Sequence, residues 1–250
     1  MILRQFLHTD PVVAVSYLLG CGGKGACVVV DPVDPPEHYL RAAADLGMGI
    51  RYVVDTHVHA DHLSTGRALA GSAGATYVLY ESVTPAFEFE TVRDGTRLDI
   101  GNVQVEVLHL PGHTPEHIGL LVTDRTRGPE PWLVVTGHTL MVGDMGRTEL
   151  ASSVGAGAEA LFGSAERLRR LPDPVVVLPG AFSGSVCGRG LSGTPMSSIG
   201  FERRFNKAFQ LTDRVAFVAL MARDIPPRPS AAAENRAHNL GQPMRTVVTA

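Results

Sequence analysis

Four side chains able to bind a metal lie within a six-residue stretch, directly after an apolar run that predicts a β-strand. The run covers residues 50–54, and the side chains are those of His57, His59, Asp61 and His62. A strand ending here would bring three imidazoles and a carboxylate into one small volume. Imidazole suits zinc, copper, iron and nickel, whereas carboxylate favours harder ions, so the mixture indicates a first-row transition metal. An ordinary polar surface loop is the alternative interpretation.

Two later segments repeat the arrangement of an apolar strand, a tight turn and a histidine. Residues 105–110 lead through a Pro-Gly turn into His113, and residues 132–136 lead through a glycine into His138. A metal site needs ligands from more than one place in the chain. We therefore expect His113 and His138 to lie beside His57 and to complete one metal site.

Apolar runs separated by turn residues predict a chain rich in strands. The predicted strands cover residues 12–19, 26–30, 50–54, 75–80, 97–100, 103–110, 117–123, 132–136 and 175–178. Helical spacing and stop residues predict helices at residues 36–46, 64–71 and 157–171, with apolar residues at helical spacing over 197–221. This order favours two packed sheets with helices outside over a doubly wound parallel sheet.

The C-terminal third of the chain changes character twice. Residues 180–195 are rich in Gly and Ser, which is typical of an ordered loop at the rim of an active site. Residues 225–250 are rich in Pro, Ala and Asn and have the composition of a tail or linker. The predicted domain therefore covers residues 1–224.

Bulk composition excludes several classes of protein. A chain of 250 residues that is 44% hydrophobic can bury one proper core. A formal net charge of −3 argues against nucleic-acid binding. No apolar run approaches the ~20 residues of a membrane span, and the N-terminus lacks the pattern of a secretion signal. Three cysteines do not make a disulfide framework, so a cytoplasmic location is expected.

The chain resembles the metallo-β-lactamase fold superfamily in three motifs, which are residues 56–62 (THVHADH), 111–114 (PGHT) and 136–140 (TGHTL). The resemblance implies an α+β fold, a four-layer αββα sandwich with its metal site at one edge. Within the superfamily the chain is most similar to the persulfide dioxygenase branch, which is close to glyoxalase II. Residues 184–188 and 199–206 are similar to bacterial members that carry a rhodanese domain, which this sequence does not contain.

Two positions depart from the superfamily pattern. His138 stands where an Asp normally ligates the metal and bridges to a second one, and Ala181 stands where a late His normally follows Pro179-Gly180. The second metal would therefore lose its bridging carboxylate and one terminal ligand. We expect one metal ion.

The resemblance implies iron as that metal. In persulfide dioxygenases the iron is held by the equivalents of His57, His113 and the Asp that His138 replaces. A set of three His would leave the centre one charge more positive and would bind a thiolate or persulfide more strongly. The predicted function is a mononuclear Fe(II) enzyme that oxidises a low-molecular-weight persulfide or thiol at sulfur with O2.

Two alternatives remain open. The same three imidazoles suit zinc with a bound water, which would make the chain a hydrolase of a thioester or lactone, as in glyoxalase II. A degenerate, non-catalytic binding protein is the other alternative. In either enzyme Asp61 is predicted to orient the nucleophile and His62 to transfer a proton.

Other side chains near the motifs are candidates for smaller roles. His59 is a ligand in glyoxalase-type sites. Arg147 is a candidate partner for a substrate carboxylate, and Cys187 could contact substrate or be an inert buried thiol. Asp144 could restore a carboxylate to the site, but a loop or salt-bridge role is the favoured interpretation.

The remaining histidines carry no ligand spacing. His117 is interpreted as a residue at the start of a strand, and His8, His38 and His109 as solvent-facing or capping residues. Residues 201–209 form an aromatic helical segment that is a candidate homodimer surface.

Overall fold

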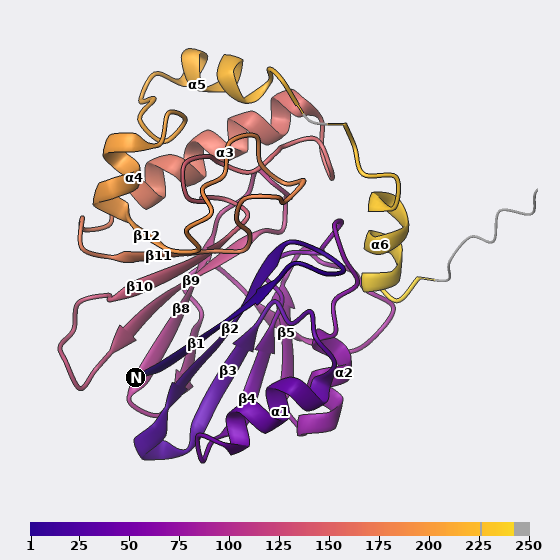
Figure 1. Ribbon diagram of the computed structural model, residues 1–250, viewed down its shortest axis with the longest axis vertical. Coiled ribbons are helices and arrows are strands. Elements are labelled where there is room, and N and C mark those ends of the chain that lie inside the picture. Colours follow the sequence, from indigo (N-terminus) through magenta and orange to yellow (C-terminus); the bar gives the residue numbers. More distant parts are fainter. Residues whose placement is uncertain (226, 243–250) are drawn as a thin grey trace, which may run out of the picture.

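The structure is a computed structural model that describes residues 1–225 and 227–242. One group of strands comprises β1 (Ile2–His8), β2 (Ala14–Cys21), β3 (Ala26–Val30), β4 (Gly49–Val54), β5 (Thr76–Tyr80) and β6 (Glu90–Val92). The other comprises β7 (Arg97–Ile100), β8 (Val103–His109), β9 (Ile118–Asp124), β10 (Leu133–Gly137), β11 (Val176–Pro179) and β12 (Ser197–Ser198). They form two six-stranded sheets, ordered β1-β2-β3-β4-β5-β6 and β12-β11-β10-β9-β8-β7 (Figure 1).

Six α-helices and one short 3₁₀ turn at Gly22–Lys24 complete the described fold. The helices are α1 (Pro36–Ala44), α2 (Gly66–Ala73), α3 (Val154–Arg169), α4 (Ile199–Phe205), α5 (Arg214–Met221) and α6 (Ala232–Asn239). Helices α1 and α2 lie with the first sheet, whereas α3, α4 and α5 lie with the second (Figure 1).

The main core lies between the two sheets, because alternate residues of a strand point to opposite faces. In β2, Val15, Tyr17 and Leu19 pack against residues of the second sheet, while Leu18 packs on the opposite face beneath α1 and α2. A third core joins Val134 of β10 to the buried faces of α3 and α5. These layers confirm the predicted αββα sandwich.

Most predicted strands differ from the structure only at their ends, but β1, β6 and β12 were not predicted. β1 pairs antiparallel with β2, with Phe6 opposite Ser16, and the three-residue β6 pairs parallel with β5. The structure also divides the predicted helical region 197–221 into α4 and α5. Asp213 ends the intervening loop by capping α5, since its carboxylate accepts a hydrogen bond from the amide of Ala216.

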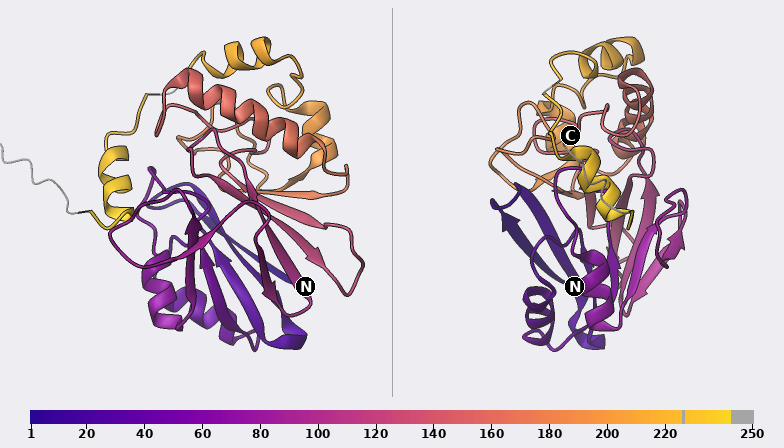
Figure 2. Two further views of the ribbon diagram at one scale, coloured as in Figure 1. Left: turned by 180° about the vertical axis from the view of Figure 1, so that it is seen from behind. Right: turned by 90° about the vertical axis from the view of Figure 1, so that its right-hand side faces the viewer.

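The predicted C-terminal tail contains a helix. Residues 232–239 form helix α6, which lies beside the N-terminal half of the chain and apart from α3 and α5 (Figure 2). Residues 243–250 of that predicted tail lie outside the described residues.

Three further observations bear on the bulk predictions. In the described parts of the chain, 1–225 and 227–242, no helix combines the length and apolar character needed to cross a membrane. The three cysteines are free and buried. Phe201 and Phe205 of α4 are exposed and lie with ring centroids 4.6 Å apart, and a dimer surface at this helix stays a prediction.

Candidate metal centre

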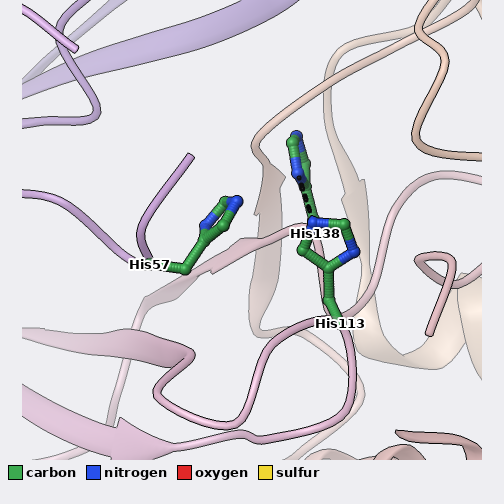
Figure 3. Close-up of side chains that lie close together, drawn as sticks. All are labelled: His57, His113 and His138. Carbon is green, nitrogen blue, oxygen red and sulfur yellow. Dashed lines mark hydrogen bonds between the residues drawn. The ribbon is translucent and has the colours of Figure 1, made fainter. Parts of the chain in front are cut away.

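Three histidines that follow different strands lie together at one edge of the sheets. His57 follows β4, His113 follows β8 and His138 follows β10. One ring nitrogen from each lies within 4.8 Å of those of the other two. The side chains come from separate segments and point toward one another (Figure 3), and each residue is at most 2% exposed. The structure thus brings together the three residues that the sequence selects as metal ligands.

The pairing of β3 with β4 sets the orientation of the His57 ring. These strands are parallel with Val30 opposite Val54, so Asp31 lies beside Thr56. The carboxylate of Asp31 accepts from the amide and the hydroxyl of Thr56, at 2.7 and 2.8 Å. Because that hydroxyl has only one proton, its oxygen accepts from His57 Nδ1 at 2.9 Å. The Nε2 lone pair of His57 therefore faces the site.

The His113 ring is oriented by a main-chain carbonyl. Nδ1 of His113 lies 2.8 Å from the carbonyl oxygen of Arg147, and a carbonyl only accepts, so Nδ1 carries the proton. Burial and the neighbouring His138 lower the pKa of His113 to about 3. The ring is therefore neutral, and Nε2 keeps a lone pair 3.2 Å from Nδ1 of His138. At that separation the two nitrogens share a proton or face a common cation.

His117 supports His138 and is not a ligand in this arrangement. It immediately precedes β9, as predicted. Its Nε2 accepts a hydrogen bond from the amide of His138 at 3.0 Å, and its Nδ1 lies 3.1 Å from the hydroxyl of Thr139. That hydroxyl donates to the carbonyl of Leu110, so it accepts from His117. Both nitrogens of His117 are thus used.

His59 also presents a nitrogen to the site. Its Nε2 lies 3.1 Å from a carboxylate oxygen of Asp31, while its buried Nδ1 has no hydrogen-bond partner among the described residues. Burial opposes a charge on this ring, but the carboxylates of Asp31, Asp61 and Asp55 together outweigh it and raise the pKa of His59 well above its ordinary value. Asp31 was not predicted from the sequence, although it is a carboxylate directly after an apolar strand and so had a recognisable signal.

Asp61 and His62 lie at the same site, as the sequence predicts. Ligand atoms of His59, Asp61 and His62 all lie within 4.8 Å of one another. His62 Nδ1 lies 3.1 Å from Asp61 Oδ1, and this bond leaves Nε2 of His62 with the lone pair. Asp61 Oδ2 and His62 Nε2 are buried with no hydrogen bond from any described residue.

Cys187 reaches the site from the Gly- and Ser-rich loop 180–195, which the sequence predicts to lie at the rim of the site. Its sulfur lies within 4.8 Å of ligand atoms of Asp61 and His138. The side chain is buried, and burial together with the nearby Asp61 raises the pKa of the thiol well above its ordinary value. The thiol is therefore uncharged.

The prediction that Arg147 meets a substrate carboxylate does not hold. Its guanidinium is buried, forms an ion pair with Glu149 and donates to the carbonyl of Val186 at 2.9 Å. A buried and paired cation is not available to an incoming anion. Arg147 instead acts through its own carbonyl, which orients His113.

Asp144 forms a salt bridge, as the sequence analysis favoured. Its carboxylate accepts from the guanidinium of Arg189 at 3.0 Å and from the amide of the same residue at 2.8 Å. The interpretation of His8 as solvent-facing or capping was wrong. His8 is buried, with its ring 2.9 Å from the hydroxyl of Ser16 and 3.4 Å from Asp34.

The donor set fits a metal ion. Four inward-facing atoms of the site are buried without a partner among residues 1–225 and 227–242: Nε2 of His57, Nδ1 of His59, Oδ2 of Asp61 and Nε2 of His62. Leaving a buried polar group unsatisfied costs about 1–3 kcal/mol. A bound cation would satisfy these atoms together, since each of them presents a lone pair when the histidine rings are neutral.

Comparison with known proteins agrees with this geometry. Residues 9–180 match the family model described as the metallo-beta-lactamase superfamily. The chain is 32% identical to a hydroxyacylglutathione hydrolase of Rhodospirillum rubrum over 66% of this chain, but it matches only 60% of that protein. It is 26% identical to persulfide dioxygenase ETHE1 of Bos taurus, over 92% of this chain and 84% of that protein.

A solved structure supports the same assignment. ETHE1 from Myxococcus xanthus superimposes with a TM-score of 0.80 at 31% identity, and the match covers 96% of this chain and all (100%) of that one. With the sandwich, the strand-end histidines and the family match in agreement, the chain belongs to the metallo-beta-lactamase superfamily.

Proposed function

We propose that the protein is a mononuclear Fe(II) enzyme that oxidises a low-molecular-weight persulfide or thiol at sulfur with O2. The observation that carries this proposal is the meeting of His57, His113 and His138 as three imidazoles in one buried site. The likeness to persulfide dioxygenase ETHE1 over 92% of this chain favours sulfur oxidation as the reaction.

His57, His113 and His138 would hold the iron. Bound there, iron would supply the redox chemistry by which a sulfur substrate reacts with O2. Three neutral imidazoles add no negative charge, so the site is more positive than one with a carboxylate ligand. It would therefore attract an anionic thiolate or persulfide.

The surrounding side chains provide orientation and proton transfer. Asp31 orients the ring of His57 through the hydroxyl of Thr56, and His117 holds the main chain of His138. Such partners outside the ligand set typically change metal affinity or activity by about 10–100-fold. The unpartnered Nε2 of His62 would accept the proton of the incoming S–H group, and Asp61 would stabilise the charge that forms on its ring. The buried position of these groups excludes bulk water.

A zinc hydrolase of a thioester or lactone is the second candidate. The relative at 32% identity is a hydroxyacylglutathione hydrolase, and His59, Asp61 and His62 form another group with metal-binding spacing. Zinc lowers the pKa of a bound water to about 7, which supplies a nucleophile at neutral pH. A non-catalytic binding protein is the third candidate.

Metal content and two assays distinguish these candidates. We expect protein purified anaerobically to contain iron at one ion per chain and to consume O2 with glutathione persulfide. His138→Ala should lose at least about tenfold in metal affinity, whereas His138→Asp should keep the iron and the O2 uptake. Zinc together with thioester hydrolysis would instead support the second candidate, and purified protein without metal would support the third.

A further inference from the structure

Helix α6 lies against the loop that carries His57, His59, Asp61 and His62. This loop, residues 55–65, contains no helix or strand, so its main-chain carbonyls need partners from elsewhere. The chain runs from α5 down to α6, which lies beside the N-terminal half (Figure 1). Hydrogen bonds from α6 supply the loop with those partners.

The amide group of Asn239 makes three hydrogen bonds to the loop. Its Nδ2 donates to the carbonyls of His59 and His62, both at 2.9 Å. Its Oδ1 accepts from the amide of Ser64 at 2.9 Å. Both protons of Nδ2 are thus used, and they fix the main chain on either side of Asp61.

Two further side chains of α6 hold the same loop. Asn235 donates to the carbonyl of Ala60 at 3.0 Å. Arg236 donates to the carbonyl of Val58 at 2.7 Å and to the carboxylate of Glu116 at 3.2 Å. That carboxylate also accepts from the amide of Val58, also at 3.2 Å. Four carbonyls of this loop, those of residues 58, 59, 60 and 62, therefore depend on one helix.

The segment that leads into α6 is anchored on the other half of the site. Arg228 donates to the carbonyl of Leu150 at 3.0 Å, and Ala232 is buried with Ala60 and Leu150. Arg147, whose carbonyl orients His113, donates to the carbonyl of Pro227 at 3.3 Å. The segment 227–242 thus contacts residues that hold the predicted metal ligands in both halves of the molecule.

We propose that α6 is a positioning element for the metal centre, and that Asn239 is its central positioning residue. By fixing the carbonyls of His59 and His62, Asn239 sets the direction in which the side chains of His59, Asp61 and His62 leave the main chain. The role in metal binding rests on the proposed metal site. The role in holding the loop does not, and it can be measured without metal.

The first test is amide hydrogen exchange of the metal-free protein. In Asn239→Ala we expect faster exchange over residues 57–64 and unchanged exchange over β9. Glu234→Ala is the matched control, because Glu234 is exposed on the same helix. Unchanged exchange over 57–64 would overturn the proposal, as would faster exchange that extends equally into β9, since that indicates general destabilisation.

The second test is metal affinity, measured by chelator competition with Fe(II) and Zn(II). Asn239→Ala should bind about 10–100-fold more weakly than wild type, and Glu234→Ala should match wild type. Asn239→Asp should be as weak as Asn239→Ala, because a carboxylate keeps the acceptor for Ser64 but cannot donate to two carbonyls. Equal affinity in Asn239→Ala and Glu234→Ala would refute the positioning role. If wild type binds neither ion, the proposed metal function fails, while the exchange test still decides whether α6 holds the loop.

Discussion

At the scale of single residues, the number of protons on each buried group decides which atoms face the site. The one hydroxyl proton of Thr56 goes to Asp31, so His57 must donate through Nδ1 and present Nε2. The choice of His57, His113 and His138 could be made from the sequence, because each follows a glycine turn or an apolar strand. The burial of Arg147 could not be predicted in this way, because its guanidinium donates to the carbonyls of Val186 and Pro227, which are distant along the chain.

His8 gives a pH-dependence prediction. Burial, together with the neighbouring rings of His62 and His38, outweighs the attraction of Asp34 and lowers the pKa of His8 below 6.5. Between the lowered pKa of the folded state and 6.5, His8 binds more protons in the unfolded chain than in the folded chain. His8 therefore contributes stability above pH 6.5 that is lost as the pH falls through this window.

The measurement compares the free energy of unfolding of wild type and His8→Gln between pH 5 and 8, with the same metal content. We expect a shallower loss of stability toward low pH in His8→Gln, because Gln does not titrate. Parallel curves for the two proteins would contradict this account of His8.

At the scale of elements, glycine turns allow the strand ends and helices to approach closely. Gly112 has φ of 142°, a conformation that favours glycine. A Cβ atom here would lie 2.5 Å from Cβ and 2.6 Å from Cα of Leu161 in α3. The Pro-Gly turn and a helix at residues 157–171 were predicted from the sequence, but the packing of this helix against the turn was not. Helix α6 was missed because its composition resembles that of a linker and its partners are loop carbonyls, which leave no periodic apolar signal.

Gly112→Ala should therefore destabilise the protein, by about 1–3 kcal/mol or more, and should displace His113. Gly163→Ala is a matched control in α3, since its added Cβ meets nothing within 4 Å. It should stabilise the helix by about 0.5–1 kcal/mol. Urea unfolding measures the change in the free energy of unfolding for both variants. Equal changes would show that close packing at Gly112 does not cause the loss of stability.

At the scale of the whole molecule, the site joins the two sheets. His57 follows a strand of the first sheet, whereas His113 and His138 follow strands of the second. An ion held by all three exists only when the sheets are packed together. Metal binding and global stability should therefore be linked.

Free metal at about 100 times its dissociation constant should raise the free energy of unfolding by about 2.7 kcal/mol. Chemical unfolding with and without metal measures this difference. His57→Ala should abolish most of the gain, because only the second sheet then supplies ligands from this set. A gain that is retained in His57→Ala would mean that the ion binds elsewhere.

The alternation of apolar runs and turns was enough to predict a sandwich of two sheets, because strand periodicity is a local property of the chain. The same local patterns placed histidines at three strand ends. The tautomers of those histidines and the partners Asp31, His117 and Asn239 were decided only by folding. The hydrogen bonds that the side chains of these three partners make join residues from 21 to 180 positions apart. No local pattern specifies which distant donors and acceptors will meet.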